Sequence, residues 1–149
     1  MERMLARPHH LLDIVTSFGA GSEFKPSAYG HAVHTCAEIV LGDLDTPIEL
    51  IAGADFICAP CKHLGADGRC DDVLSQLDPP VSKQDYNDAL DRRLLEHFGL
   101  DEGAQMSFGE YLGIVRECFE GVPEICAHPG QAPEQRASNL AAGLTKLGL

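Results

Sequence analysis

The chain has 149 residues, of which 44% are hydrophobic, and a formal net charge of −12 from 11 Lys and Arg against 23 Asp and Glu. This length suits a single domain over residues 1–149, and the acidic balance without a basic run excludes nucleic acid as a partner. No apolar run reaches the length of a membrane span, and the N-terminus lacks the apolar core of a signal peptide, so we expect a cytoplasmic protein outside the membrane.

The first third of the chain carries signals for two helices and a strand. Pro8 opens a helix that the glycines at 19 and 21 end. An apolar face repeats over Ser27–Leu41, which predicts a second helix stopped by Gly42. The segment Pro47–Ala52 is the best strand candidate, and it leads directly into a loop that contains cysteines.

Capping signals organise the second half of the chain. Ser82 precedes a helix that runs to about Phe98. Ser107, with Glu110 three residues on, predicts a further helix through Phe119, and Pro133–Leu147 forms a last one. The fold class expected is mostly α (α+β): a small helical domain with one or two short strands and a cysteine-bearing metal loop.

Three cysteines lie in the loop from 55 to 72, at Cys58, Cys61 and Cys70. Two thiolates separated by two residues can bind one centre, and a flexible segment can fold a third onto it. In a reducing compartment, cysteines clustered in this way bind metals or do redox chemistry more often than they form disulfides. A thioredoxin-like dithiol would need a long helix starting at this pair, and Gly65 and Gly68 predict a loop instead.

One of the three remaining cysteines is a candidate for the fourth ligand. Cys36 and Cys118 fall within amphipathic helical patterns, where a buried cysteine acts as a small hydrophobe. Cys126 lies outside a helix, between Pro123 and Pro129, and is free to face a ligand. We therefore take Cys126 as the candidate partner of the three loop cysteines.

Three short motifs stand out: R-P-H-H-L-L at 7–12, D-F-I-C-A-P-C at 55–61 with the third cysteine at 70, and I-C at 125–126. With these motifs the chain resembles an uncharacterised family of short bacterial and archaeal proteins, thought from their cysteines to bind an iron–sulfur cluster. Typical members carry a cysteine where this chain has Asp13, and a late C-x-x-C-x-W motif in which Pro129 takes the second cysteine's place.

These departures leave one set of four thiolates: Cys58, Cys61, Cys70 and Cys126. A [4Fe–4S] cluster held by all four is the first expectation, and a tetrahedral zinc ion on the same four is the second. A zinc site with three cysteines and one histidine, either His63 or His128, is also open.

Histidines form a second constellation. His9 and His10 open the first helix, and adjacent helical residues point about 100° apart, so we expect at most one of them to meet a given centre. His31 and His34 lie three residues apart on the second predicted helix, where with a carboxylate they could hold a second metal or act as acid–base groups, although a solvated polar face is the simpler interpretation. Asp13, one turn after the histidine pair, could orient an imidazole.

Three functions follow from these patterns. The leading hypothesis is a small [4Fe–4S] protein that transfers electrons to a protein redox partner, senses redox state, or binds a small molecule near His9 and His10. A second is a zinc-stapled enzyme whose catalytic candidates are His10, Asp13, His31 and His34. The third is a zinc-stapled module that binds another protein.

Overall fold

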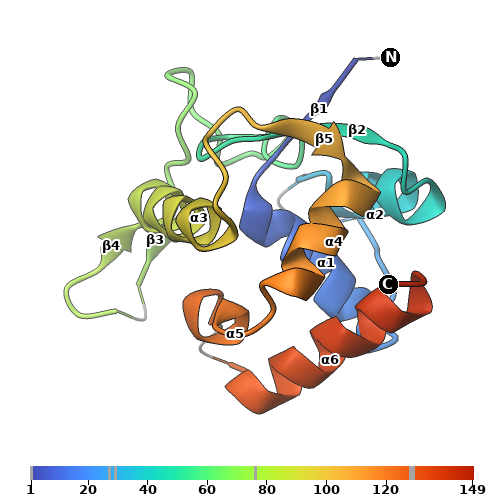
Figure 1. Ribbon diagram of the computed structural model, residues 1–149. Coiled ribbons are helices and arrows are strands. Elements are labelled where there is room, and N and C mark those ends of the chain that lie inside the picture. The colour runs from blue at the N-terminus through green and yellow to red at the C-terminus, as the bar shows by residue number, and fades with distance from the viewer. Residues whose placement is uncertain (1, 27, 29, 76, 128–129) are drawn as a thin grey trace.

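The computed structural model describes residues 2–26, 28, 30–75, 77–127 and 130–149 and has an α+β fold, which confirms the predicted class. Figure 1 labels the helices α1 (Pro8–Gly19), α2 (Val33–Gly42), α3 (Lys83–Phe98), α4 (Phe108–Glu117), α5 (Val122–Ile125) and α6 (Pro133–Lys146). The strands are β1 (Met4–Ala6), β2 (Pro47–Leu50), β3 (Val73–Leu74), β4 (Val81–Ser82) and β5 (Gln105–Ser107). No helix in these described ranges is long and apolar enough to cross a bilayer.

The main sheet has three short strands with β2 at its centre. β1 pairs with β2 in parallel and β5 pairs with it antiparallel, so that Ile48 lies between Met4 and Met106. The sequence signals identify β2 alone, because β1 and β5 are three residues long and show no full period of alternation. β3 and β4 form a separate antiparallel pair that projects beside α3 (Figure 1).

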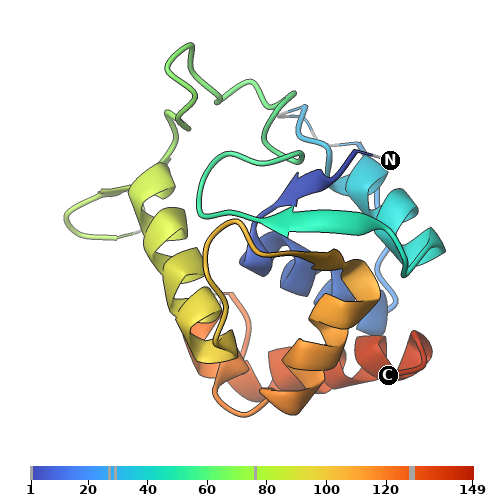
Figure 2. The ribbon, with the colours of Figure 1, turned by 45° about the horizontal axis from the view of Figure 1, so that its top comes forward.

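Helix α1 runs through the middle of the core, with Leu11, Leu12, Ile14 and Val15 almost completely buried. Helix α6 lies against α1 along the lower side of the molecule (Figure 2). Glycine permits this close approach, because a Cβ on Gly143 would collide with the backbone carbonyl of Val15.

The predicted caps place α3 and α4 correctly. The Ser82 hydroxyl accepts the Asp85 N–H, and Gly99 closes α3 with a left-handed φ of 69°. Ser107 and Glu110 form the expected capping box of α4. That helix ends at Glu117 rather than at residue 119, and α6 agrees with its prediction to within one residue.

The second predicted helix begins too early. The prediction starts at Ser27, whereas α2 starts at Val33 and the described residues 28 and 30–32 are not helical. Gly30 has a φ of 77°, a left-handed conformation that interrupts a helix, and the Ala32 N–H bonds to the Ile57 carbonyl. Ser27 itself lies outside the described residues.

Candidate metal centre

The loop that follows β2 brings Cys58, Cys61 and Cys70 to one small cavity of about 80 Å³. A tight turn sets the first pair, in which the Cys61 N–H donates to the Cys58 carbonyl at 2.9 Å. A bridge between Leu64 and Cys70 then folds the chain back on itself. No helix starts at the Cys58–Cys61 pair, so the structure agrees with a loop rather than a thioredoxin-like site.

His10, in the first turn of α1, lines the same cavity. Its Nδ1 lies 2.9 Å from Asp55 Oδ2. One ligand atom from each of His10, Asp55 and Cys58 lies within 4.8 Å of the other two, a separation that suits a shared cation. Since a carboxylate only accepts hydrogen bonds, Asp55 fixes the proton on Nδ1 and leaves Nε2 with the lone pair that binds metals.

Asp55 itself has no acceptor position left for a metal. Its Oδ2 accepts the Arg7 backbone N–H at 2.7 Å as well as His10, and its Oδ1 accepts the N–H groups of Ile57 at 3.1 Å and Cys58 at 3.2 Å. These four contacts use the roughly four lone-pair positions of a carboxylate. Asp55 therefore orients the ligands around it rather than serving as one.

Burial and charge shift the pKa values of these groups. Burial is the largest single influence on the pKa of His10 and lowers it, but the charge and hydrogen bond of Asp55, with the charges of Asp91 and Asp13, together raise it by more, so the pKa lies above its usual value. Burial alone would raise the pKa of Asp55, yet its pKa is about 2 because His10 and the donated hydrogen bonds stabilise the carboxylate. Burial and the Asp55 charge raise the pKa of the Cys58 thiol to about 11. A cation that binds here must displace protons.

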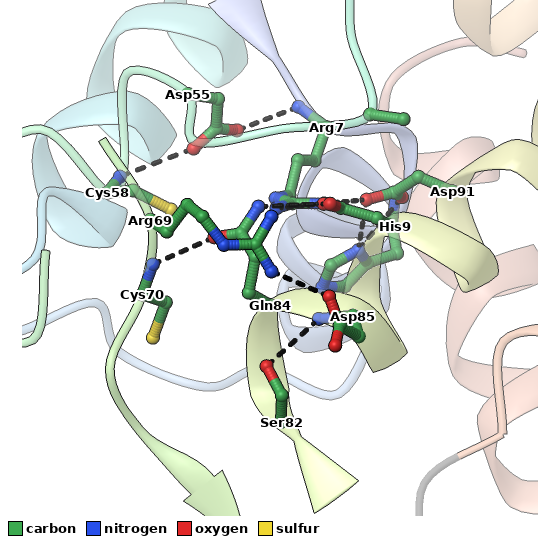
Figure 3. A network of polar contacts seen from close by, with 12 residues as sticks. Arg7, His9, Asp55, Cys58, Arg69, Cys70, Ser82, Gln84, Asp85 and Asp91 are labelled. Atoms are coloured by element: carbon green, nitrogen blue, oxygen red, sulfur yellow. Dashed lines mark hydrogen bonds and ion pairs between the residues drawn. The ribbon is translucent and has the colours of Figure 1, made fainter. Parts of the chain in front are cut away.

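A buried polar network joins the loop to α1 and α3 (Figure 3). The Cys70 N–H donates to Gln84 Oε1 at 2.8 Å, and Gln84 in turn donates to Asp88. Arg7 donates to Asp88 at 2.7 Å and to Asp91 at 2.8 Å. Arg7 is only 2% exposed and lines the cysteine cavity, and within the described ranges its Nε has no hydrogen-bond partner.

Cys126 does not line the cavity of the three loop cysteines. It lines a second cavity and is buried beside Arg136, whose guanidinium lies 3.6 Å from its sulfur. Burial, with the charge of Asp13, raises the pKa of this thiol to about 12. The two cavities adjoin, because His10 and His31 line both. Cys126 as the fourth ligand stays a prediction.

The adjacent histidines are held by different carboxylates. His9 Nδ1 lies 2.9 Å from Asp91 Oδ1, whereas His10 Nδ1 contacts Asp55. Their rings, 4.4 Å apart between centroids, both line the second cavity, but of the two only His10 lines the cysteine cavity. The expectation that at most one of them meets a given centre stays a prediction.

The other candidate residues are spread over the molecule. His31 precedes α2, so the helical alignment with His34 is wrong, and His34 lines neither of these two cavities. Asp13 pairs with Arg136 at 2.8 Å rather than with an imidazole. His63 lies 2.9 Å from Asp71 and does not line the cysteine cavity, and His128 lies outside the described residues.

The sequence predicted no role in the site for five residues of this network: Arg7, Asp55, Gln84, Asp88 and Asp91. A signal for three of them was present, because positions 84, 88 and 91 repeat at the four- and three-residue spacing of one helical face. Polar residues on a face that should be buried indicate a partner of opposite charge, which is Arg7.

A family model matches residues 28–129, a range that contains all four candidate cysteines and leaves the R-P-H-H-L-L segment outside. No match was found among curated proteins or among solved structures. Because the matched range covers more than half of the chain, the protein belongs to the family described as a protein of unknown function, DUF1284.

Proposed function

We propose that this protein binds a zinc ion through the thiolates of Cys58, Cys61 and Cys70 and the Nε2 atom of His10. The observation that carries the proposal is the shared cavity of the three cysteines and His10, with the other nitrogen of His10 held by Asp55. Three sulfur ligands and one nitrogen ligand form a common tetrahedral zinc set. Histidines that bind metals almost always donate their second N–H to a carboxylate or carbonyl.

One hydrogen-bond donor in the cavity wall suits a thiolate. Arg7 lines the cavity, and its Nε–H has no partner among the described residues, so it is left to donate to a sulfur. The charge of this guanidinium is already balanced by Asp88 and Asp91. The bound ion would fix the loop against α1 and α3, and zinc would be a structural element of the fold.

A [4Fe–4S] cluster on Cys58, Cys61, Cys70 and Cys126 is the second candidate. It is favoured by the position of Cys126 in the wall of the adjoining cavity, which shares His10 and His31 with the cysteine cavity. In this arrangement a fourth thiolate replaces the imidazole, and the usual four-cysteine ligation of such clusters results. Its role would be electron transfer, redox sensing or the binding of a small molecule.

Metal analysis together with a visible spectrum, on protein purified without oxygen, distinguishes the two. We expect colourless protein with one equivalent of zinc per chain, and loss of the zinc in the Cys58→Ser and Cys70→Ser variants. Cys118→Ser is the matched control, because Cys118 caps α4 away from both cavities and should retain full occupancy.

Variants of the fourth ligand complete the test. Loss of zinc in His10→Ala but not in Cys126→Ser supports the proposed set. Brown protein that contains iron and sulfide, and loses its colour in Cys126→Ser, would overturn zinc in favour of the cluster. Protein that binds neither metal after reconstitution would refute both candidates.

A further inference from the structure

The second cavity, of about 470 Å³, is large enough for a small organic molecule. Its walls come from the first turns of α1, the start of α2, the N-terminal half of α3, the β3–β4 hairpin, the segment after α5 and Arg136 of α6. The described lining residues include charged groups from α1, α3 and α6 and a set of aliphatic side chains.

Two cationic side chains line the cavity in a protein that is otherwise strongly negative. They are Lys83 and Arg136, and Asp13 is the one carboxylate among the described lining residues. Arg136 is held in place, because its Nε donates to the Cys126 carbonyl at 3.1 Å and one terminal nitrogen donates to Asp13. Each cation has one carboxylate partner, Asp72 for Lys83 and Asp13 for Arg136, so an anion in the cavity would compete for these contacts.

Lys83 has the freedom to bind a ligand directly. Its ammonium lies 3.5 Å from Asp72, longer than a good hydrogen bond, and its side chain is 40% exposed. An ion pair that is so exposed contributes little stability, so the lysine can turn to an anion in the cavity at small cost. Arg136, which lines the same cavity, would supply a second contact.

The aliphatic lining residues offer a surface for a hydrocarbon body. They are Val33, Leu74, Leu77 and the buried Leu90. Leu77 remains 36% exposed, unusually high for a leucine at the edge of a cavity. A bound apolar group would remove this surface from water.

We propose that this cavity binds a small amphiphilic anion, with a carboxylate or phosphate head between Lys83 and Arg136 and an apolar body on Leu74 and Leu77. The inference goes beyond metal binding. None of the three loop cysteines lines this cavity, although His10 and Lys83 line both cavities.

Calorimetric titration with octanoate, octyl phosphate and 1-octanol tests the proposal on the full chain. The three probes share one hydrocarbon chain and differ in the head group. We expect an anionic probe to bind at least about tenfold more tightly than octanol, which is the effect of one charged hydrogen bond. The tighter of the two anions identifies the head group.

Matched variants locate the probe. Lys83→Met should weaken octanoate binding by about tenfold. Arg92→Met, which removes the same charge from an exposed position on the same helix, should leave the affinity unchanged. Likewise Leu74→Asn should weaken binding, whereas Val73→Asn, on the neighbouring 52% exposed residue of the same strand, should not.

One variant should bind the anion more tightly, a result that misfolding cannot produce. Asp13→Asn removes the carboxylate that competes for Arg136, so octanoate affinity should rise by about threefold to tenfold.

Equal affinity for octanol and octanoate would overturn the proposal, as would equal losses of octanoate affinity in Lys83→Met and Arg92→Met. Octanoate binding that disappears in Cys58→Ser but survives in Leu74→Asn would place the probe at the cysteine cavity and refute this site, whatever metal the protein contains, because Leu74 lines only the second cavity.

Discussion

Asp55 holds three segments of the chain together with a single buried carboxylate. It accepts hydrogen bonds from the residue that precedes α1, from the ring of His10 and from the start of the cysteine loop. An asparagine of the same shape has one acceptor oxygen and turns an N–H₂ group toward donors. The substitution of Asp55 by asparagine therefore disturbs the orientation of the His10 ring and of the cysteine loop without removing side-chain volume.

We expect Asp55→Asn to lower zinc affinity by about 10- to 100-fold, the usual effect of losing the partner of a metal-bound histidine. Competition with a chromophoric chelator measures this change. Asp71→Asn is the control, because Asp71 makes the same 2.9 Å contact to a histidine, His63, on the exposed side of the loop. Equal losses in the two variants would instead support His63 as a ligand.

Tyr111 gives the protein a stability that depends on pH. Its hydroxyl is completely buried and donates to the Pro8 carbonyl at 2.9 Å. Burial raises its pKa well above the usual value, and the charge of Asp91 adds to this. Since only the unfolded chain loses this proton near pH 10, the hydroxyl stabilises the fold fully below that pH and progressively less above it.

Tyr111→Phe should therefore reduce the free energy of unfolding at pH 7 by about 1–3 kcal/mol, the cost of leaving a buried carbonyl unpaired. Above pH 10 the wild type should lose its advantage by about 1.4 kcal/mol for each pH unit. Urea unfolding of both proteins at pH 7 and pH 10.5 provides the comparison. A difference between them that does not change with pH would contradict the role assigned to the buried hydroxyl.

At the scale of elements, the contact between α1 and α6 depends on glycine. The two helices approach until a Cβ on Gly143 would collide with the backbone of Val15, and backbone cannot move aside as a flexible side chain can. Gly143→Ala should thus destabilise the protein by about 1–3 kcal/mol, despite the higher helix propensity of alanine.

Gly113→Ala is the matched control for that substitution. Gly113 lies within α4, and a Cβ there meets no atom within 4 Å. Alanine should stabilise this helix by about 0.5–1 kcal/mol. Thermal unfolding of the two variants should give shifts of opposite sign, and a gain at both positions would show that α1 and α6 can separate without cost.

The helices were predictable where a local signal set their ends. Ser82, Ser107 and Pro133 each mark a helix start, and each start agrees with the structure to within one residue. The apolar pattern continues before Val33 and through Gly30. Periodicity therefore predicted a helix that starts too early, because Gly30 has a left-handed φ that interrupts a helix. Short strands such as β1 depend on partners far along the chain, which no local window contains.

In the candidate site, too, the sequence predicted what local signals determine and missed what depends on distant contacts. Spacing was enough to select the three loop cysteines that share a cavity, because their loop is local. The contributions of Arg7 and Asp91 were not accessible, since their contact spans 84 positions. The position of Cys126 likewise depends on how α5 and α6 pack, which its neighbours in sequence do not specify.

At the scale of the whole molecule, the three loop cysteines lie outside the hydrophobic core. The buried apolar cluster draws on α1, α2, α3, α4 and α6 and takes only Ile57 from the loop of residues 55–72. Removing zinc with a chelator should therefore accelerate amide exchange in the loop of residues 58–71 and leave α1 and α4 protected. Hydrogen exchange followed by mass spectrometry measures this, and a global loss of protection would show that the metal is needed for the entire fold.

The pairing of α1 with α6 has a consequence for the order in which the chain folds. A contact between the two helices, from Lys146 to Phe18, spans 128 positions, so α1 stays without this partner until the segment that contains α6 has left the ribosome. Contacts of such long range slow folding. During synthesis the apolar face of α1 is open to chaperones or to other nascent chains, and rare codons or a bulky fusion close to α6 would prolong that exposure.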